Sequence, residues 1–175
     1  MPERVGAVVL AAGEGSRFGG AKQKLLLPSV LARLARASVD DIVVVLGAHR
    51  FRVEGARTVE AAGWERGPGV SLRAGLAALD PDVAVAVVCL ADGPLLAPEA
   101  VERVLAACLG GAGGFVAASY GGVRGHPVAL TRAAWAGIPD DGGRSLDAVL
   151  VPCDDLGSPG DVDTPADLRR LEPLL

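Results

Sequence analysis

The sequence predicts an α/β protein with three layers, in which helices cover both faces of a mostly parallel central sheet. Apolar runs of strand length alternate along the chain with stretches of helical periodicity, which is the order expected for such a sheet. The runs Asp41–Leu46 and Val83–Leu90 are apolar at almost every position, as in strands buried on both faces. Half of the residues are hydrophobic but only 3% are aromatic, so Val, Leu and Ala must form the core.

In the first half of the chain, the apolar run 6–10 predicts a strand that ends at a glycine-rich loop. Residues 28–37 predict a helix, because their apolar side chains fall on one side. Asp41–Leu46 is the second predicted strand and 57–61 a short third one. A second helix is predicted to open at Gly69, where leucines recur every three or four residues.

In the second half, Val83–Leu90 is the most hydrophobic run and is expected at the centre of the sheet. Pro98–Leu109 predicts a helix from apolar residues at helical spacing, and 115–119 and 127–130 predict two more strands. A last helix is predicted after Thr164, which offers a hydroxyl cap before a proline at the first helical position.

Composition narrows the classes of protein. The 175 residues fit one domain spanning 1–175, since no repeat or low-complexity linker divides them. A net charge of −4 with dispersed basic residues argues against a nucleic-acid surface. Without a membrane-length apolar stretch or a signal peptide, the protein is expected in the cytoplasm and not in a membrane. Cys89, Cys108 and Cys153 lack metal-site spacing and are expected to be small buried hydrophobic residues.

The glycine-rich loop after the first strand is the most informative stretch. Glycines at 13, 15, 19 and 20 leave backbone N–H groups free to point at an anion. Arg17, Lys22 and Lys24 add positive charge beside them, and the two lysines are the only ones in the chain. A flexible ammonium suits a phosphate that moves during a reaction, so the loop predicts a polyphosphate site.

Two common phosphate loops fit this stretch poorly. A Walker loop needs Lys directly after its last glycine and then a hydroxyl residue, but Ala21 follows Gly20 and Gln23 follows Lys22. In a dinucleotide loop the third glycine would come one residue before Gly19, and an acid would end the second strand. Neither condition is met.

A third type fits. Residues 10–19, Leu-Ala-Ala-Gly-Glu-Gly-Ser-Arg-Phe-Gly, followed by Lys and a leucine run, resemble the signature of the MobA-like NTP transferases, with one extra residue before Ser16. The Leu-Ala-Ala-Gly form resembles the branch that cytidylylates molybdenum cofactor. The resemblance implies a Rossmann-like nucleotidyltransferase fold and a nucleotide site at the following residues: Leu10, Ala11, Ala12, Gly13, Gly15 and Ser16.

Acidic residues follow at two places. Asp92 comes directly after Val83–Leu90, at the carboxyl edge of the predicted sheet, and a carboxylate there suits Mg²⁺. Asp161 and Asp163 precede the last helix, where the helix dipole alone would favour acids. Resemblance to the family's Asp-x-Pro and Asp-x-Asp-Thr-Pro motifs implies that Asp92 and Asp163 hold the metal, with Asp161 in support.

Three further segments resemble family motifs. Residues 67–76 resemble its Ser-Leu-x-x-Gly helix, which implies nucleotide contacts from Gly69, Ser71 and Arg73, although a capped surface helix fits the residues equally well. Residues 122–128 resemble a Gly-x-Arg-Gly-His-Pro segment, and 141–146 a Gly-x-Arg loop. They imply an acceptor site formed by Arg124, His126 and Arg144, while a lone histidine such as His126 is as often structural.

The resemblance implies transfer of CMP from CTP to the phosphate of molybdopterin, with release of pyrophosphate and Mg²⁺ as cofactor. Arg17 and Lys22 or Lys24 would stabilise the leaving pyrophosphate. GTP or another phosphorylated acceptor is an alternative within this class. Two alternatives lie outside the nucleotidyltransferase class. The turn and strand pair that the family usually has after Pro28 is missing here, so the protein could instead be a non-catalytic nucleotide-binding factor that serves a molybdoenzyme apoprotein. An NADP-dependent reductase with Arg50 on the 2′-phosphate is disfavoured, because Tyr120 has no lysine four residues later.

Overall fold

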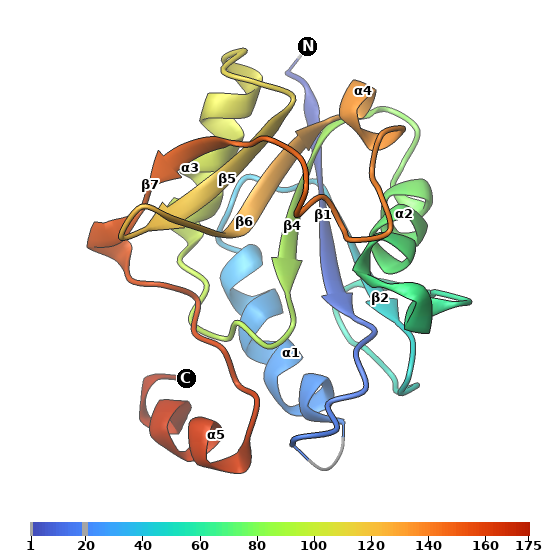
Figure 1. Ribbon diagram of the computed structural model, residues 1–175, viewed down its shortest axis with the longest axis vertical. Coiled ribbons are helices and arrows are strands. Elements are labelled where there is room, and N and C mark those ends of the chain that lie inside the picture. Colours follow the sequence, from blue (N-terminus) through green and yellow to red (C-terminus); the bar gives the residue numbers. More distant parts are fainter. Residues whose placement is uncertain (1, 19–20) are drawn as a thin grey trace.

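The computed structural model describes residues 2–18 and 21–175, and it contains a seven-stranded sheet of order β3-β2-β1-β4-β6-β5-β7 (Figure 1). Of these strands only β6 is antiparallel to its neighbours. The strands are β1 (Arg4–Ala11), β2 (Asp41–Leu46), β3 (Arg57–Glu60), β4 (Val83–Leu90), β5 (Phe115–Tyr120), β6 (Val123–Thr131) and β7 (Val149–Pro152). The α-helices are α1 (Lys22–Leu34), α2 (Pro68–Ala78), α3 (Pro98–Leu109), α4 (Arg132–Trp135) and α5 (Pro165–Leu171).

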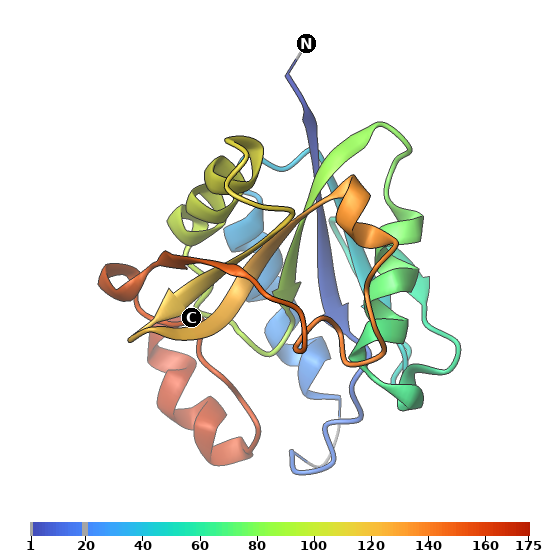
Figure 2. The same ribbon diagram turned by 45° about the horizontal axis from the view of Figure 1, so that its top comes forward.

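The core lies on both faces of the sheet, which confirms the three-layer prediction (Figure 2). Alternate residues of β1 point to opposite faces: Val9 joins the cluster under α1 and α3, and Val8 the cluster under α2. Both side chains are fully buried. The three cysteines are buried and unpaired, as expected. Within the described ranges, no helix is long and apolar enough to cross a membrane.

The first helix corrects the sequence prediction. It was expected over 28–37 but begins at Lys22, ends at Leu34 and contains Pro28 in its interior. Proline suggested a helix start because it removes a backbone donor and favours the first turn. Burial of Leu26 and Leu27, both at most 2% exposed, accounts for the six additional N-terminal residues.

Further differences lie at the end of the sheet that carries β5, β6 and β7. Strand β6 begins at Val123, four residues before the predicted start, and β7 was not predicted. Strand β7 is short and mostly exposed, so it lacks the apolar run that marks a buried strand. It pairs in parallel with β5. The predicted cap of α5 is confirmed, with the Thr164 hydroxyl accepting from the Asp167 N–H at 3.2 Å.

Three chain segments meet at the carboxyl edge of the sheet. The arrowheads of β1 and β4 point the same way (Figure 1). The N–H of Ala91 donates to the carbonyl of Leu10, and the N–H of Val162 to that of Asp92. These bonds join the ends of β1 and β4 to the segment that carries the last acidic motif.

Candidate active site

Asp92, Asp161 and Asp163 form an acidic cluster at this edge. One carboxylate oxygen from each lies within 4.8 Å of the others. Strand β4 delivers Asp92, and the bond from the Val162 N–H to the Asp92 carbonyl, 3.2 Å long, brings the other two beside it. Partial desolvation of its carboxylate, together with the charges of Asp92 and Asp163, raises the pKa of Asp161. The cluster therefore attracts cations.

Lys22, in the first turn of α1, lies inside the cluster with only 7% of its side chain exposed. Its Nζ is 3.1 Å from both Asp92 Oδ2 and Asp163 Oδ1, and it donates to the Val162 carbonyl at 2.5 Å. Burial acts to lower the pKa of Lys22, but the charges and hydrogen bonds of Asp92 and Asp163 outweigh it and raise that pKa. The ammonium is therefore charged at neutral pH and holds the carboxylates together.

The glycine-rich loop faces the cluster across a hollow of about 180 Å³, here called the loop hollow. Arg17 Nη2 lies 3.1 Å from Asp163 Oδ2 while 74% of its side chain stays exposed. Gly15 has a φ of 64°, which favours glycine. Gly19 and Gly20 lie outside the described residues. The hollow is lined by Gly13, Gly15, Ser16, Arg17, Lys22, Gln23, Asp92 and Asp163.

A second hollow of about 410 Å³, the α2 hollow, adjoins the first at the N-terminus of α2. Among its walls are Leu10, Ala12, Gly13, Gln23, Trp64, Glu65, Ser71, Asp92 and Arg144. The sequence interpretation missed Gln23, Trp64 and Glu65. A signal existed for Gln23, since it directly follows the signature lysine, but Trp64 and Glu65 belong to no motif and reach the hollow through the 3₁₀ turn Trp64–Arg66.

A third hollow of about 370 Å³, the β6 hollow, lies on the other side of Leu10 and Leu90. Its walls are largely apolar, with Arg124, His126 and Arg144 among the polar groups. Burial lowers the pKa of His126 to about 4, so its imidazole is neutral at physiological pH. Arg144 lines this hollow and the α2 hollow and so stands at their junction.

Four predicted site residues are directed elsewhere. Lys24 lies on another side of α1 and lines a separate groove with Phe51 and Arg52. The N–H of Gly69 donates to the Asp140 carbonyl, and a Cβ on Gly69 would lie 1.9 Å from the Pro139 carbonyl oxygen. The Ala11 side chain is in the core, and Arg73 donates to the Ile138 carbonyl at 2.8 Å and pairs with Asp140 at 2.5 Å.

Arg124 has a similar structural role while it lines the β6 hollow. Its guanidinium donates to the carbonyls of Leu146 at 2.8 Å and Gly143 at 3.0 Å, and stacks 4.6 Å above the Phe115 ring. Arg73 and Arg124 thus hold the same loop, 138–146, from two sides. That loop carries Arg144, so both arginines position a residue that faces two hollows.

The donor set of the acidic cluster fits a hard divalent cation. Mg²⁺ and Mn²⁺ prefer carboxylate oxygens and usually take one or two of them from a protein, with water and phosphate oxygens completing the shell. Asp92 and Asp163 are partly buried, Asp161 is exposed, and the loop hollow opens beside them.

The sequence pattern of the MobA-like NTP transferase domain matches residues 7–150. The chain belongs to the MobA-like NTP transferase family. Its function is therefore of the nucleotidyltransferase type. No curated protein sequence matches the chain.

Solved structures agree with this assignment. The Rv0371c homolog from Mycobacterium sp. strain JC1 is 27% identical, with a TM-score of 0.81 over 99% of this chain and 98% of that one. Rv0371c of Mycobacterium tuberculosis H37Rv, solved as a complex with manganese, is 25% identical, with a TM-score of 0.77 over 98% and 100% of the two chains. Molybdopterin-guanine dinucleotide biosynthesis protein A from Archaeoglobus fulgidus shares the fold at 18% identity, with a TM-score of 0.68 over 97% of both chains.

Proposed function

We propose that this nucleotidyltransferase transfers CMP from CTP to the phosphate of molybdopterin and releases pyrophosphate. The observation that carries the proposal is the position of the acidic cluster, which borders both the loop hollow and the α2 hollow. Arg144 lines the α2 hollow and the β6 hollow and so links these two. The donor and acceptor are both anionic, so catalysis consists mainly of positioning them and neutralising charge.

Each hollow suits one part of the reactants. Backbone N–H groups of the glycine-rich loop, Arg17 and Lys22 would bind the β- and γ-phosphates in the loop hollow and stabilise the pyrophosphate as it leaves. The α2 hollow, with Trp64 and Ser71 in its wall, would take the base. The apolar β6 hollow, with Arg144 at its mouth, would take the body and the phosphate of the acceptor.

Asp92 and Asp163, with Asp161 beside them, would hold Mg²⁺, which neutralises charge on the reacting phosphates when bound. Lys22 occupies the space between Asp92 and Asp163 in this structure, so its ammonium must move toward the phosphates when the ion binds. The attacking phosphate is already ionised at neutral pH and needs no general base.

Pyrophosphate release tests the proposal. CTP, molybdopterin and Mg²⁺ are expected to give pyrophosphate and a cytosine dinucleotide, whereas GTP in place of CTP gives little. Faster release with GTP would overturn the choice of base, and nucleotide binding without release under all conditions would favour the non-catalytic alternative. A melting-temperature panel with the four NTPs and Mg²⁺ identifies the bound nucleotide independently of the acceptor.

Asp92→Ala tests the metal role. The variant is expected to lose pyrophosphate release while it retains most of its affinity for CTP, because the phosphates keep their other contacts. Asp82→Ala is the matched control, since Asp82 is an exposed acid at the opposite edge of the sheet. Unchanged turnover in Asp92→Ala would refute the role given to this residue.

A further inference from the structure

Gln23 is a buried polar side chain to which neither the family motifs nor the proposed reaction assigns a task. It follows Lys22 in α1 and is only 5% exposed. Its Nε2 donates to the Gly13 carbonyl at 3.1 Å. No donor among residues 2–18 and 21–175 reaches its Oε1, which is the one buried side-chain oxygen or nitrogen of that part of the chain without a partner. A buried acceptor without a donor is costly, so we expect a water or a ligand to donate to it.

The orientation of this amide is determined by its neighbour. The Gly13 carbonyl can only accept a hydrogen bond, so the Gln23 nitrogen must face it and the oxygen must face away. A ligand at Oε1 must therefore supply a donor.

Gln23 also lies at the junction of two hollows. It lines both the loop hollow and the α2 hollow, and Gly13 and Asp92 are the other residues that line both. In a nucleoside triphosphate the sugar joins the phosphates to the base. Under the proposed function, the phosphates fill the loop hollow and the base the α2 hollow, so the sugar would lie at the junction, beside Gln23.

Phosphate oxygens at neutral pH are acceptors and cannot satisfy Oε1, whereas the sugar hydroxyls can donate to it. We propose that Gln23 Oε1 accepts a hydrogen bond from a sugar hydroxyl of the nucleotide and so makes the protein select ribonucleotides. This inference rests on the proposed function, because it assumes that a nucleotide spans these two hollows. It does not depend on the acceptor.

Binding of CTP, 2′-deoxyCTP and 3′-deoxyCTP, measured by titration calorimetry with Mg²⁺ and no acceptor, tests the inference. For the wild-type protein, at least one deoxy analogue is expected to bind about tenfold more weakly than CTP, which corresponds to one lost hydrogen bond to a buried acceptor. In Gln23→Met, which keeps the length of the side chain, that ratio is expected to fall to within about twofold of one.

Leu25→Gln serves as the control, because Leu25 is 60% exposed on the same helix and lines none of the three hollows. It should retain the wild-type ratio. Equal binding of all three nucleotides to the wild-type protein overturns the inference but not the proposed function, and it needs no variant to fold. The inference is also overturned if Gln23→Met shows the same ratio of CTP affinity to deoxy-analogue affinity as the wild-type protein. Failure of every NTP to bind overturns both.

Discussion

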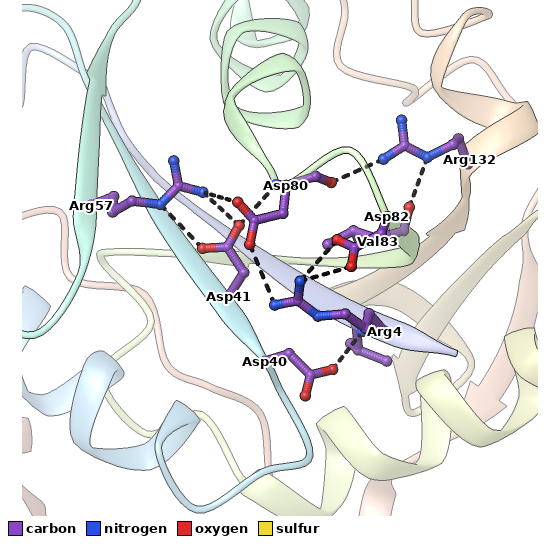
Figure 3. A network of polar contacts seen from close by, with 9 residues as sticks. Arg4, Asp40, Asp41, Arg57, Asp80, Asp82, Val83 and Arg132 are labelled. Atoms are coloured by element: carbon purple, nitrogen blue, oxygen red, sulfur yellow. Dashed lines mark hydrogen bonds and ion pairs between the residues drawn. The ribbon is translucent and has the colours of Figure 1, made fainter. Parts of the chain in front are cut away.

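At the amino edge of the sheet, where β1, β2 and β4 begin, acids and arginines pair with one another (Figure 3). Arg4 lies 2.8 Å from Asp82 and 3.3 Å from Asp80. Arg57 lies 2.6 Å from Asp41 and 3.5 Å from Asp80. The hydrogen bond from Arg4 holds the pKa of Asp82 below its ordinary value. Each of these charges has an opposite charge beside it.

The carboxyl edge is arranged differently. There, three carboxylates lie within 4.8 Å of one another, and in the described part of the chain Lys22 and Arg17 are the cations that pair with them. The pKa of Asp161 is raised, opposite to that of Asp82 at the other edge. At the amino edge each of these carboxylates has an arginine within 3.5 Å, and the pairs stabilise the fold. At the carboxyl edge Asp161 forms no ion pair within the described residues, and the cluster lies beside open hollows, so it can bind cations and their phosphates.

After Asp92→Ala, the largest expected effect of a single change at the carboxyl edge is that of Lys22→Met. Turnover should fall about 10²–10³-fold, because a buried donor to the phosphates is lost. Without metal the variant should also lose about 2 kcal/mol of stability, since Asp92 and Asp163 are left facing each other. The pKa of Lys22 is raised above its ordinary 10.5, so its stabilising contribution is present throughout neutral pH and is lost only in alkali.

Mn²⁺ sharpens this test. It should raise the melting temperature of Lys22→Met more than that of the wild-type protein, because the ammonium no longer competes for the carboxylates. An equal increase in both proteins would mean that the acidic cluster is not the site of the metal, and the contrast between the two edges would then lose its functional meaning.

The burial of His126, which lines the β6 hollow, can be tested by the pH dependence of stability. With a native pKa of about 4 and an ordinary value of 6.5, the imidazole takes up a proton in the unfolded chain before it does so in the folded one. Stability should therefore fall as the pH drops from 6.5 to 4, by about 3 kcal/mol at most from this group. Chemical denaturation of His126→Gln over this range should show a shallower decline, and parallel curves would contradict the burial of this histidine.

At the amino edge, Asp41→Ala should affect stability alone. The Asp41 carboxylate is 8% exposed and accepts from Arg57 and from the backbone N–H of Asp80 at 3.0 Å. Loss of both bonds should cost about 2 kcal/mol in urea denaturation. Pyrophosphate release per folded molecule should stay at the wild-type rate, and a large loss of turnover would break the proposed division between the edges.

Arg4→Met should have the smallest effect. Its guanidinium and both of its acidic partners are well exposed, so solvent and salt screen the pairs. We expect the melting temperature to change by no more than about 2 °C, and any difference to vanish at high salt. A larger or salt-independent change would show that the amino-edge network acts as one cooperative unit.

The sequence was most informative where structure depends on neighbours along the chain. The apolar runs of β2 and β4 and the periodicity of α3 predicted those elements with the bounds that the structure shows. The hydroxyl cap at Thr164 was equally clear, because Asp167, whose N–H donates to it, lies only three residues later. The family motifs, each a short run of neighbouring residues, also indicated the MobA-like family, which the family pattern over residues 7–150 confirms.

Tertiary structure decided which side chains meet. The sequence could not choose between Lys22 and Lys24, because the choice depends on which face of α1 meets Asp163, a residue 141 positions away. For the same reason it could not predict that Arg73 and Arg124 would hold a loop. Nor could it predict that Gln23 Oε1, at the junction of two hollows, would find no donor among the residues that the structure describes. Hydrophobic pattern and local hydrogen bonds depend on residues close in sequence, whereas the pairing of charges and the shape of a cavity depend on segments that only folding brings together.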